Sequence, residues 1–425
     1  MATIFAVASG PPPAAIAVMR ISGPLAIDVA TRLAGTLPPP RRAAVRALRS
    51  ARGSLLDRAL VIVFPGPNSV TGEDMVELHL HGGRAVVAAV AEALAAMDGV
   101  RPAVAGEFTR RALIAGRIDL AEAEGLGDLL AAETESQRRA ALRVAEGAIS
   151  RAVEGWRLRV LAAAATIEAA LDFADEDDVG APDIAAVCAA LHELKEEIER
   201  MLGAPPVERL RDGVRVVLAG PPNSGKSTLL NALVEREAAI VSPIAGTTRD
   251  RIEQSVVRGG MAFILTDTAG LAEGTDDAIE AIGVARAKEA MAGADLVLWL
   301  GEDPPAAGSS VLWLAAQADR LDRSGATGRL AVSAVTGAGI SALWAAIVDR
   351  ATSLVPREDQ LALNARQRGH CADCAAALRA AVEEEDMLVV AEQLRLARGA
   401  LDRITGAAQV EDMLDALFSR FCIGK

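Results

Sequence analysis

Residues 220–228 read "GPPNSGKST" and decide the fold of the central part of the chain. They match the pattern G-x-x-x-x-G-K-[ST] in full, directly after the apolar run "VRVVLA" and before the helix-favouring "TLLNAL". In such a loop backbone N–H groups surround phosphate oxygens, Lys226 reaches the β- and γ-phosphates, and the Ser227 hydroxyl can bind Mg²⁺. The predicted nucleotide contacts from this loop are Asn223, Ser224, Gly225, Lys226, Ser227 and Thr228.

Three further motifs follow in the order expected of a GTPase. "SPIAGTTRD" supplies Thr248, whose hydroxyl suits a contact with Mg²⁺ and the γ-phosphate. "DTAG" follows a predicted strand, which puts Asp267 at the metal and the Gly270 N–H at the γ-phosphate. "VSA" fits the loop around a guanine base through Ser333 and Ala334. The motifs together predict a GTP-binding domain, and its further predicted contacts are Thr268 and Ala269.

Composition limits the classes of protein that the chain can belong to. Its 425 residues favour two or three domains. It has no continuous apolar run of about 18 residues, and the start "MATIFAVASGPPP" lacks a secretory signal, so we expect a cytoplasmic protein without a membrane span. Four scattered cysteines agree with a reducing compartment. With a net charge of −13, any nucleic acid must be bound by local basic patches.

The organisation of the chain predicts a helical domain that is interrupted by an α/β domain. Up to about residue 117 strands are predicted for "IAVMRISG", "LDRALVIVF" and "MVELHLH", and a helix for "RAVVAAVAEALAAM". Helical patterns fill 119–211 and 364–421, whereas strands and helices alternate over 213–350. Insertion of the central unit explains the two similar helical flanks, and tandem independent domains are the alternative.

The motifs over nearly the whole length resemble the MnmE (TrmE) family of tRNA-modification GTPases. They include "RISGP", "FPGPNSVTGEDMVELHLHGG", "GEFTRRALIAGRIDLAEAEGLGDLL", "GPPNSGKSTLLNAL", "IAGTTRD", "DTAGL" and the terminal "FSRFCIGK". The fold class implied is multidomain α/β plus all-α. The implied parts are an N-terminal α/β folate-binding and dimerisation domain (1–117), a discontinuous helical domain (118–211 and 354–425) and an inserted Ras-like P-loop GTPase domain (212–353).

The resemblance also implies an activity and its partners. With an FAD-dependent partner of the MnmG/GidA type, such a homodimer builds a carboxymethylaminomethyl or aminomethyl group at C5 of the wobble uridine of tRNA. The carbon comes from a tetrahydrofolate derivative, either 5-formyl- or 5,10-methylene-tetrahydrofolate. The implied folate ligands are Arg20, Glu77, Arg117 and Lys425, with Arg117 standing where the family usually has lysine. Cys422 matches the family's C-terminal cysteine, so we set aside a prenylation site, whose pattern Gly424 and Lys425 fit badly.

In the GTPase domain the resemblance implies K⁺, bound at Asn223, Ser242, Ile244 and Thr247. A monovalent cation there neutralises charge that develops between the β- and γ-phosphates. The surrounding loop adds the predicted contacts Ser242, Pro243, Ile244, Ala245, Gly246 and Thr247. Leu271 stands where some GTPases carry the glutamine that orients water, and Glu280 matches the acid that the family is proposed to use instead.

One motif departs from the family pattern. Where the family has N-K-x-D, this chain has "AQAD", with Ala316 and Gln317 in place of asparagine and lysine and Asp319 retained. Asp319 can still accept two hydrogen bonds from the guanine N1 and N2 groups, so selectivity against adenine should persist. We expect weakened nucleotide binding, because the bracing asparagine and the lysine stem are missing.

Three other clusters admit a functional and a structural interpretation. Glu77, His79 and His81 share one face of a predicted strand and have the ligand types of a metal site, but a polar pocket wall is favoured. His370, Cys371 and Cys374 share a helix face, and a buried stripe is favoured over a metal or redox site. The segment "RRAAVRALRSAR" suits either tRNA phosphates or a solvated surface.

Two other classes of function remain open at this point. A ribosome-assembly or regulatory GTPase would share the nucleotide motifs, although such proteins usually carry a separate RNA-binding module. A folate-dependent one-carbon carrier with a decayed GTPase domain would share the N-terminal motifs. Measuring tetrahydrofolate binding and GTP turnover on one preparation separates the three.

Overall fold

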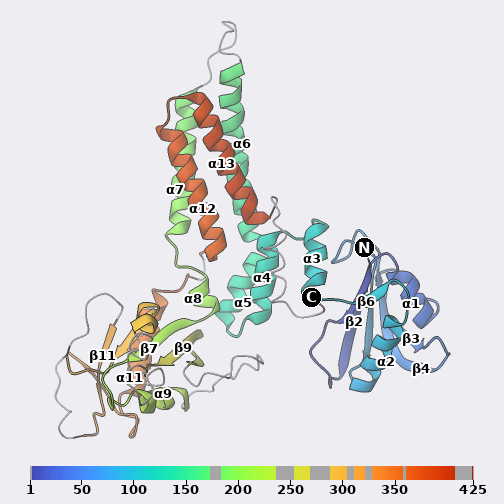
Figure 1. Cartoon of the computed structure of the whole chain (residues 1–425), viewed down its shortest axis with the longest axis horizontal. Helices are drawn as coiled ribbons and strands as arrows, with labels where there is room; N and C mark the ends of the chain where they lie inside the picture. The colour runs from blue at the N-terminus through green and yellow to red at the C-terminus, as the bar shows by residue number, and fades with distance from the viewer. Residues whose placement is uncertain are drawn as a thin grey trace, which may run out of the picture. The chain divides into compact units, whose positions relative to one another are not determined.

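The computed structural model describes residues 2–172, 183–235, 253–268, 288–303, 311–320, 328–357, 360–406 and 424. The chain forms two compact units (Figure 1). The first contains residues 1–127 and 405–425, and the second contains residues 128–404. Among the described residues, no helix has the length and apolar character needed to cross a membrane.

The N-terminal unit is built on a six-stranded sheet in the order β3-β4-β5-β2-β1-β6. The alternation in "MVELHLH" puts Val76, Leu78 and Leu80 on one face, where α1 and α2 cover them, and Glu77 and His79 on the other. The strands and helices of this unit are β1 (Thr3–Val7), β2 (Ile16–Ser22), α1 (Ala26–Ala34), β3 (Ala44–Arg49), β4 (Leu55–Phe64), β5 (Met75–His81), α2 (Arg84–Ala95), β6 (Val100–Pro102) and α3 (Glu107–Ile114).

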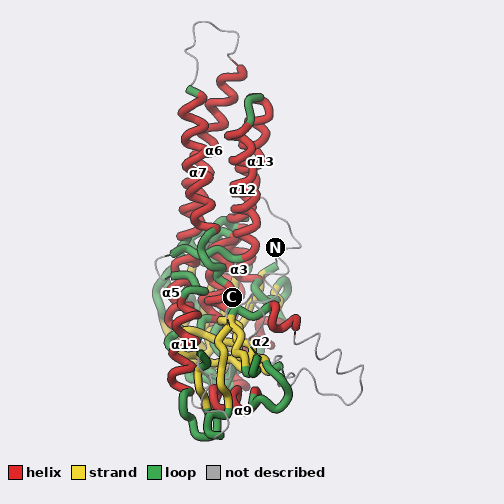
Figure 2. The backbone as a smooth tube through the Cα atoms, turned by 90° about the vertical axis from the view of Figure 1, so that its left-hand side faces the viewer, coloured by secondary structure: helices red, strands yellow, loops and turns green. Residues whose placement is uncertain are grey.

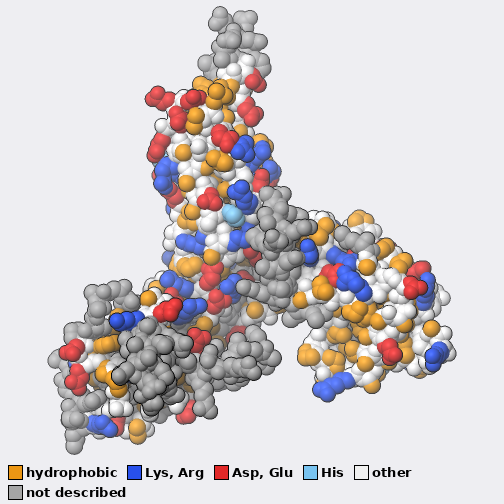
Figure 3. Space-filling view, in the orientation of Figure 1, with side chains coloured by type: hydrophobic (Ala, Val, Ile, Leu, Met, Phe, Trp, Pro, Cys, Tyr) orange, Lys and Arg blue, Asp and Glu red, His pale blue; other side chains and the backbone are white. Residues whose placement is uncertain are grey.

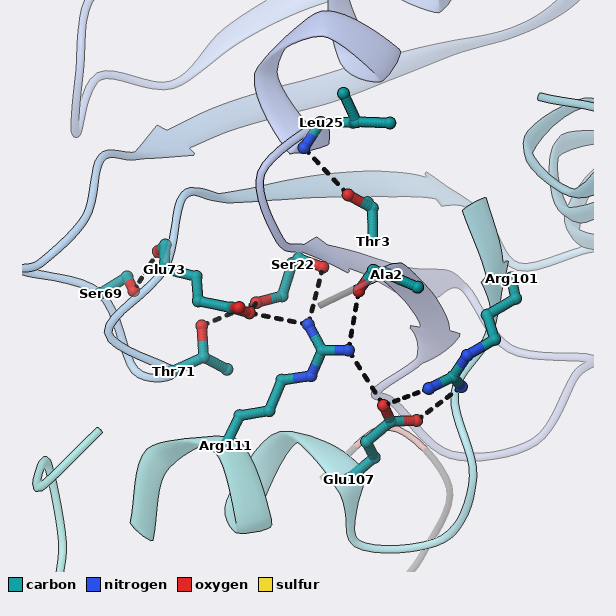
Figure 4. Close-up of polar contacts among 10 residues, drawn as sticks. All are labelled: Ala2, Thr3, Ser22, Leu25, Ser69, Thr71, Glu73, Arg101, Glu107 and Arg111. Atoms are coloured by element: carbon teal, nitrogen blue, oxygen red, sulfur yellow. Dashed lines mark hydrogen bonds and ion pairs between the residues drawn. The ribbon is translucent and has the colours of Figure 1, made fainter. Parts of the chain in front are cut away.

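A buried arginine ties several segments of this unit to α3 (Figure 4). Arg111 donates to Glu73 Oε2 at 2.7 Å, to Glu107 Oε1 at 3.0 Å and to the Ala2 carbonyl at 2.8 Å. Burial would raise the pKa of Glu107, but hydrogen bonds from Arg101, the Val104 N–H and Arg111 outweigh it and hold that pKa below its ordinary value. The network fixes the "SVTGED" segment and the chain start against the helix that leads to Arg117.

The second unit contains long helices that lie side by side (Figures 1 and 2). Helix α7 precedes the inserted GTPase part and α12 follows it, and the two pack together. This confirms the interrupted helical arrangement and excludes tandem independent domains. The helices are α4 (Leu120–Ala131), which crosses from the first unit, α5 (Glu135–Ala145), α6 (Ala148–Asp172), α7 (Ile184–Leu202), α8 (Glu208–Arg211), α12 (Ala365–Glu383) and α13 (Met387–Thr405).

Local sequence signals explain where these helices begin and end. Thr134 and Asn364 each form a capping box with the glutamine three residues on, and Asp183 caps α7 through the Ala186 N–H. At the end of α7, Arg368 of α12 donates to the carbonyls of Leu202 and Ala204, which helical hydrogen bonds would leave unpaired. The visible face of the helices carries acidic and basic side chains interspersed (Figure 3).

The GTPase part is a second six-stranded sheet in the order β12-β11-β10-β7-β9-β8. All neighbouring strands are parallel except β8 and β9, which form an antiparallel hairpin. Phe263 and Trp344 meet edge to face at 5.5 Å in its core. The elements are β7 (Val214–Ala219), α9 (Lys226–Glu235), β8 (Glu253–Arg258), β9 (Met261–Asp267), β10 (Leu296–Trp299), β11 (Val311–Ala316), β12 (Leu330–Val332) and α11 (Ile340–Thr352).

Candidate functional site

The predicted phosphate loop lies between the end of β7 and the start of α9. Gly220 and Gly225 have φ of 151° and 93°, which favour glycine, and Asn223 has φ of 58°. The Lys226 ammonium donates to the carbonyls of Gly220 at 3.0 Å and Pro221 at 2.9 Å, within the loop. Burial lowers the pKa of Lys226, and the nearby Asp267 carboxylate opposes this shift. The arrangement places a cation and backbone N–H groups where phosphates would bind.

The predicted Mg²⁺ ligands from two motifs meet at the carboxyl ends of β7 and β9. The Ser227 hydroxyl donates to the Asp267 carboxylate. Thr268 fixes this end of β9, since its hydroxyl donates to the Leu218 carbonyl of β7 at 2.8 Å. A hydroxyl and a carboxylate oxygen side by side are the donors that Mg²⁺ prefers, so the residues fit the metal.

The predicted guanine site is a cavity beside the phosphate loop. Asp319 lies at its edge and accepts a hydrogen bond from the buried Ser333 hydroxyl at 2.6 Å, which lowers the pKa of the Asp319 carboxyl. That bond orients the carboxylate and leaves oxygen lone pairs to accept from a base. Other lining residues are Gly225, Thr228, Leu229, Ala316, Gln317, Arg320, Val332, Ala334 and Val335.

Gln317, at the altered position of the guanine motif, reaches the phosphate loop. Its backbone has φ of 58°, and its Nε2 donates to the Asn223 carbonyl at 3.3 Å. Its side chain also lies against Gly225, where an added Cβ would be 3.2 Å from Nε2. The amide therefore contacts the phosphate loop from the position where the family pattern has lysine.

In the N-terminal unit, Arg20 and Glu77 lie opposite each other on β2 and β5. Arg20 Nε donates to Glu77 Oε1 at 2.8 Å, and His79 Nε2 lies 3.4 Å from Glu77 Oε2. Arg117 lies beside Gly72, because a methyl group there would be 3.6 Å from Arg117 Cγ. The structure thus pairs two of the predicted folate ligands and places the third against the "SVTGED" segment that precedes β5.

The C-terminal segment reaches the same unit at Gly424. This buried glycine has φ of 103°, and a Cβ on it would be 2.1 Å from the Val7 carbonyl oxygen. Val7 ends β1, the strand on which Ala6 is the partner of Arg20. Gly424 therefore lies against β1, whose partner strand β2 carries Arg20.

Among the described residues, no group of three His, Cys, Asp or Glu side chains could hold a metal ion. His81 shares the strand face of Glu77 and His79 by alternation. Its Nδ1 is hydrogen-bonded to Oδ1 of the buried Asp57 at 2.7 Å. Cys371 and Cys374 are fully buried free thiols, and burial raises the pKa of each to about 12. The interpretation of that helix face as a buried stripe is confirmed.

The arginine-rich segment forms the edge strand β3 and the turns beside it. Arg46 donates to the Thr36 carbonyl and Arg49 to the Gly53 carbonyl, while Arg41 contacts the Asn68 carbonyl and the Phe64 ring. These bonds use part of each guanidinium and leave other N–H groups for solvent or phosphate. Contact with tRNA at this edge stays a prediction.

Two family models and full-length relatives place the chain in one family. The model described as "GTP-binding protein TrmE N-terminus" matches residues 3–117, and "MnmE helical domain" matches residues 120–422. The chain is 60% identical over 426 residues to "tRNA modification GTPase MnmE" of Rhizorhabdus wittichii, with 100% of this chain and 96% of that protein covered. This chain belongs to the MnmE family of tRNA modification GTPases.

Other matches agree with the MnmE assignment. The MnmE of Erythrobacter litoralis is 56% identical over 429 residues, with both chains covered in full. Among solved structures, the G domain of a T. maritima FeoB iron transporter is 25% identical over 32% of this chain and 98% of that one. Its TM-score of 0.23 is too low to add to the assignment to MnmE.

Several residues predicted from the GTPase motifs or from the MnmE resemblance lie outside the described part of the chain. They stay predictions, as do the bounds of the four predicted domains and the roles of the described site residues. The residues concerned are Ser242, Pro243, Ile244, Ala245, Gly246, Thr247, Thr248, Ala269, Gly270, Glu280, Cys422 and Lys425.

Sequence reasoning missed residues of this MnmE chain that position the sites from a distance. The Arg111 network is one of them: Glu107 and Arg111 stand four apart in α3, a helix that the sequence analysis does not predict. The sequence shows that Gln317 departs from the family's N-K-x-D pattern, but it does not reveal the hydrogen bond from Gln317 to Asn223. Nothing in the sequence pattern indicated the bond between Asp57 and His81.

Proposed function

We propose that this GTP-hydrolysing tRNA modification enzyme uses a tetrahydrofolate one-carbon unit to build an aminomethyl-type group at C5 of the wobble uridine. It acts with an FAD-dependent partner of the MnmG/GidA type. The observation that carries the proposal is the Arg20–Glu77 pair, with the chain end at Gly424 beside the neighbouring strand.

The N-terminal site has the chemistry that a folate requires. A pterin edge offers N–H donors to a carboxylate such as Glu77, while carbonyls and the glutamate tail require cations such as Arg20 and Arg117. The Glu77 side chain is 13% exposed and that of Arg20 is 25% exposed, so both reach the surface from a mostly covered position. A tetrahydrofolate would supply the transferred carbon.

Homodimerisation through this unit completes the proposal. Ile16 and Val45 lie on strands β2 and β3 and are 57% and 60% exposed, on the sheet face opposite to α1 and α2. Exposed apolar side chains on an uncovered sheet face suit a second copy of the chain.

Tetrahydrofolate binding, GTP turnover and molar mass, measured on one preparation, test the proposal. We expect folate binding, turnover and a mass of two chains. GTP turnover without folate binding would favour the ribosome-assembly or regulatory alternative.

In the GTPase part, we propose that Ser227, Asp267 and Thr248 hold Mg²⁺, and that Asn223 and the 242–247 loop hold K⁺. When bound, these cations would stabilise negative charge on the phosphates during hydrolysis. Lys226 orients the β- and γ-phosphates, and Glu280 would orient the attacking water because Leu271 cannot. Gln317 donates to the carbonyl of Asn223, whose backbone is left-handed with φ of 58°.

We expect GTP hydrolysis to be slow in Na⁺ and at least about tenfold faster in K⁺, with the acceleration rising with protein concentration as GTPase domains pair. The reason is that Asn223 and the 242–247 loop match the potassium-binding positions of the family, and Leu271 cannot orient the attacking water. Turnover measured in matched NaCl and KCl over a range of protein concentrations checks this. Equal rates in both salts at every concentration would contradict it.

Gly424→Ala should displace the chain end. Its Cβ would lie 2.1 Å from a backbone oxygen, and alanine tolerates φ of 103° poorly, so the segment cannot keep its place. We expect tetrahydrofolate affinity and tRNA modification to fall about tenfold or more, with GTP turnover unchanged. Gly10→Ala, where a Cβ meets nothing within 4 Å, is the matched control.

Restoring the guanine motif with Ala316→Asn and Gln317→Lys should tighten GDP binding. The asparagine brace and the lysine stem over the base contribute about 1–3 kcal/mol together, or roughly 5- to 150-fold in affinity. Because Gln317 already contacts the phosphate loop, we expect a result near the lower bound. Calorimetry with GDP and ADP checks both affinity and selectivity, and sub-micromolar GDP binding by the unaltered chain would refute this account of the motif.

A further inference from the structure

The first turn of α5 contacts the GTPase part at one place and the segment that enters it at another. Ser136 Oγ donates to the Gly260 carbonyl at 2.9 Å, in the turn that joins β8 and β9. Gln137 Nε2 donates to the carbonyls of Leu210 and Arg211 at 3.0 and 2.9 Å, in the segment that leads into β7. Neighbouring residues of one helix thus contact both a hairpin turn and the entry segment of the GTPase part.

The hairpin is the part of the GTPase sheet that joins the two predicted switch motifs. Strand β8 begins at Glu253, five residues after Thr248, and β9 ends at Asp267. The two strands are paired without interruption from Glu253 with Thr266 to Arg258 with Met261. The hairpin therefore links Asp267, the predicted metal ligand at the end of β9, to the turn at Gly260.

The turn is held closely on its other sides. A Cβ at Gly259 would lie 3.3 Å from Val348 Cγ1 of α11, and one at Gly213 would lie 3.1 Å from the Ala262 carbonyl oxygen. Helix α8 contacts both α5 and β9 (Figure 1). The turn thus lies against α11, and Ala262 of β9 lies against the entry segment, so the hairpin is closely packed on both sides.

The α5 end of the contact is rigid. Gln137 is 7% exposed, and its Oε1 accepts from the N–H groups of Glu133 and Thr134 at 2.8 Å each, which closes the capping box of α5. The amide oxygen of Gln137 therefore caps α5, and its amide nitrogen binds the carbonyls of the entry segment. Arg211, which follows Leu210, is also 3.7 Å from Asp128 of α4.

We infer that the first turn of α5 couples the GTP site to the helical part of the molecule, with Ser136 and Gln137 as positioning residues that respond to the β8–β9 hairpin. The inference rests on the family's GTPase and tRNA-modification activities, and it does not depend on the folate proposal. A change of nucleotide state moves the hairpin, and α5 carries that movement into the helices.

Gln137→Glu separates coupling from helix capping. The new carboxylate keeps an oxygen for the Glu133 and Thr134 N–H groups, and it places a second oxygen against the carbonyls of Leu210 and Arg211, which repels them. Ser136→Ala removes the bond to Gly260, together with the 3.1 Å hydrogen bond between the Ser136 and Thr134 hydroxyls, and keeps the bond from the Gln137 N–H to Thr134. Gln367→Glu makes the same change in the capping box of α12 and is the matched control.

Three measurements on the full-length chain test the inference. The first is hydrogen exchange of residues 133–145 in the GDP state and in the GDP–aluminium fluoride state with K⁺. The others are GTP turnover and the content of modified wobble uridine in tRNA from cells that carry each variant. In the unaltered chain and in Gln367→Glu, exchange should differ between the two nucleotide states.

In the Ser136→Ala, Gln137→Glu double variant, that difference should fall at least threefold and modification at least tenfold, while GTP turnover stays within about twofold. If Gln137→Glu lowers the melting temperature enough to prevent the comparison, the test uses the Ser136→Ala single variant. In that variant we expect the exchange difference between the two nucleotide states to fall at least twofold. No nucleotide-dependent exchange in the unaltered chain, or wild-type exchange and modification in the variants, would overturn the inference.

Discussion

Asp319→Asn should change the nucleotide preference of this enzyme from guanine to xanthine and weaken GDP binding by roughly 10²- to 10⁴-fold. Asp319 can accept from both guanine donors, N1–H and the N2 amino group, while the Ser333 hydroxyl orients it at 2.6 Å. Each hydrogen bond to a charged group contributes about 1.5–3 kcal/mol, and the asparagine amide instead places a donor opposite the N2 amino group. Xanthine has a carbonyl at that position, which accepts from the amide.

The measurement is binding of GDP, XDP and ADP to the variant and to the unaltered chain by calorimetry. Asp349→Asn, the same charge change on the exposed side of α11, is the control and should leave all three affinities unchanged. Unaltered GDP affinity in Asp319→Asn, or no gain of XDP binding, would remove Asp319 from base recognition.

Cys422→Ser should abolish tRNA modification, with a loss of about 100-fold or more, and leave GTP turnover within about twofold. A serine hydroxyl stays protonated where a thiol can ionise, so it cannot replace a thiolate in covalent or acid–base chemistry. Cys422 lies outside the described residues, but Gly424, two positions on, lies against Val7 in the unit that carries Arg20 and Glu77. The phosphate loop belongs to the other compact unit.

Wobble-uridine analysis of tRNA from cells that carry the variant, together with GTP turnover of the purified protein, checks this expectation. Cys188→Ser on α7 is the control, since that partly exposed free thiol has no predicted role. Full modification by Cys422→Ser would exclude the cysteine from the chemistry, and a parallel loss of GTP turnover would show that the change acts through the fold.

The parts of the nucleotide site that the sequence predicted are those whose chemistry is local. Lys226 and Ser227 stand in one loop between a strand and a helix, and parallel pairing of β7 with β9 necessarily brings Asp267 to the same edge of the sheet. The two strands beside the chain start, β1 and β6, were not predicted. β6 has three residues, and "VRP" carries no alternation from which a strand can be recognised.

Contacts between residues far apart in the chain could not be predicted in the same way. Arg111 meets Glu73 across 38 positions, and Gln137 meets Leu210 across 73. The spacing of Thr134 and Gln137 is a local sequence signal for a capping box. The direction of the Gln137 Nε2 group, in contrast, depends on how α5 packs on α8. Gln317 shows the same limit, because its effect on Asn223 depends on a backbone with φ of 58° that the sequence does not reveal.

The close approach of the segments that enter and leave the GTPase part has a consequence for protein engineering. The Val207 N–H donates to the Leu363 carbonyl at 3.3 Å, so the chain segments on either side of the GTPase part lie next to each other. A short glycine–serine linker that joins residue 207 to residue 363 can therefore replace all the residues between them without stretching α7 or α12. The same junction would accept a foreign domain whose own termini lie close together, which makes it a site for building chimaeras.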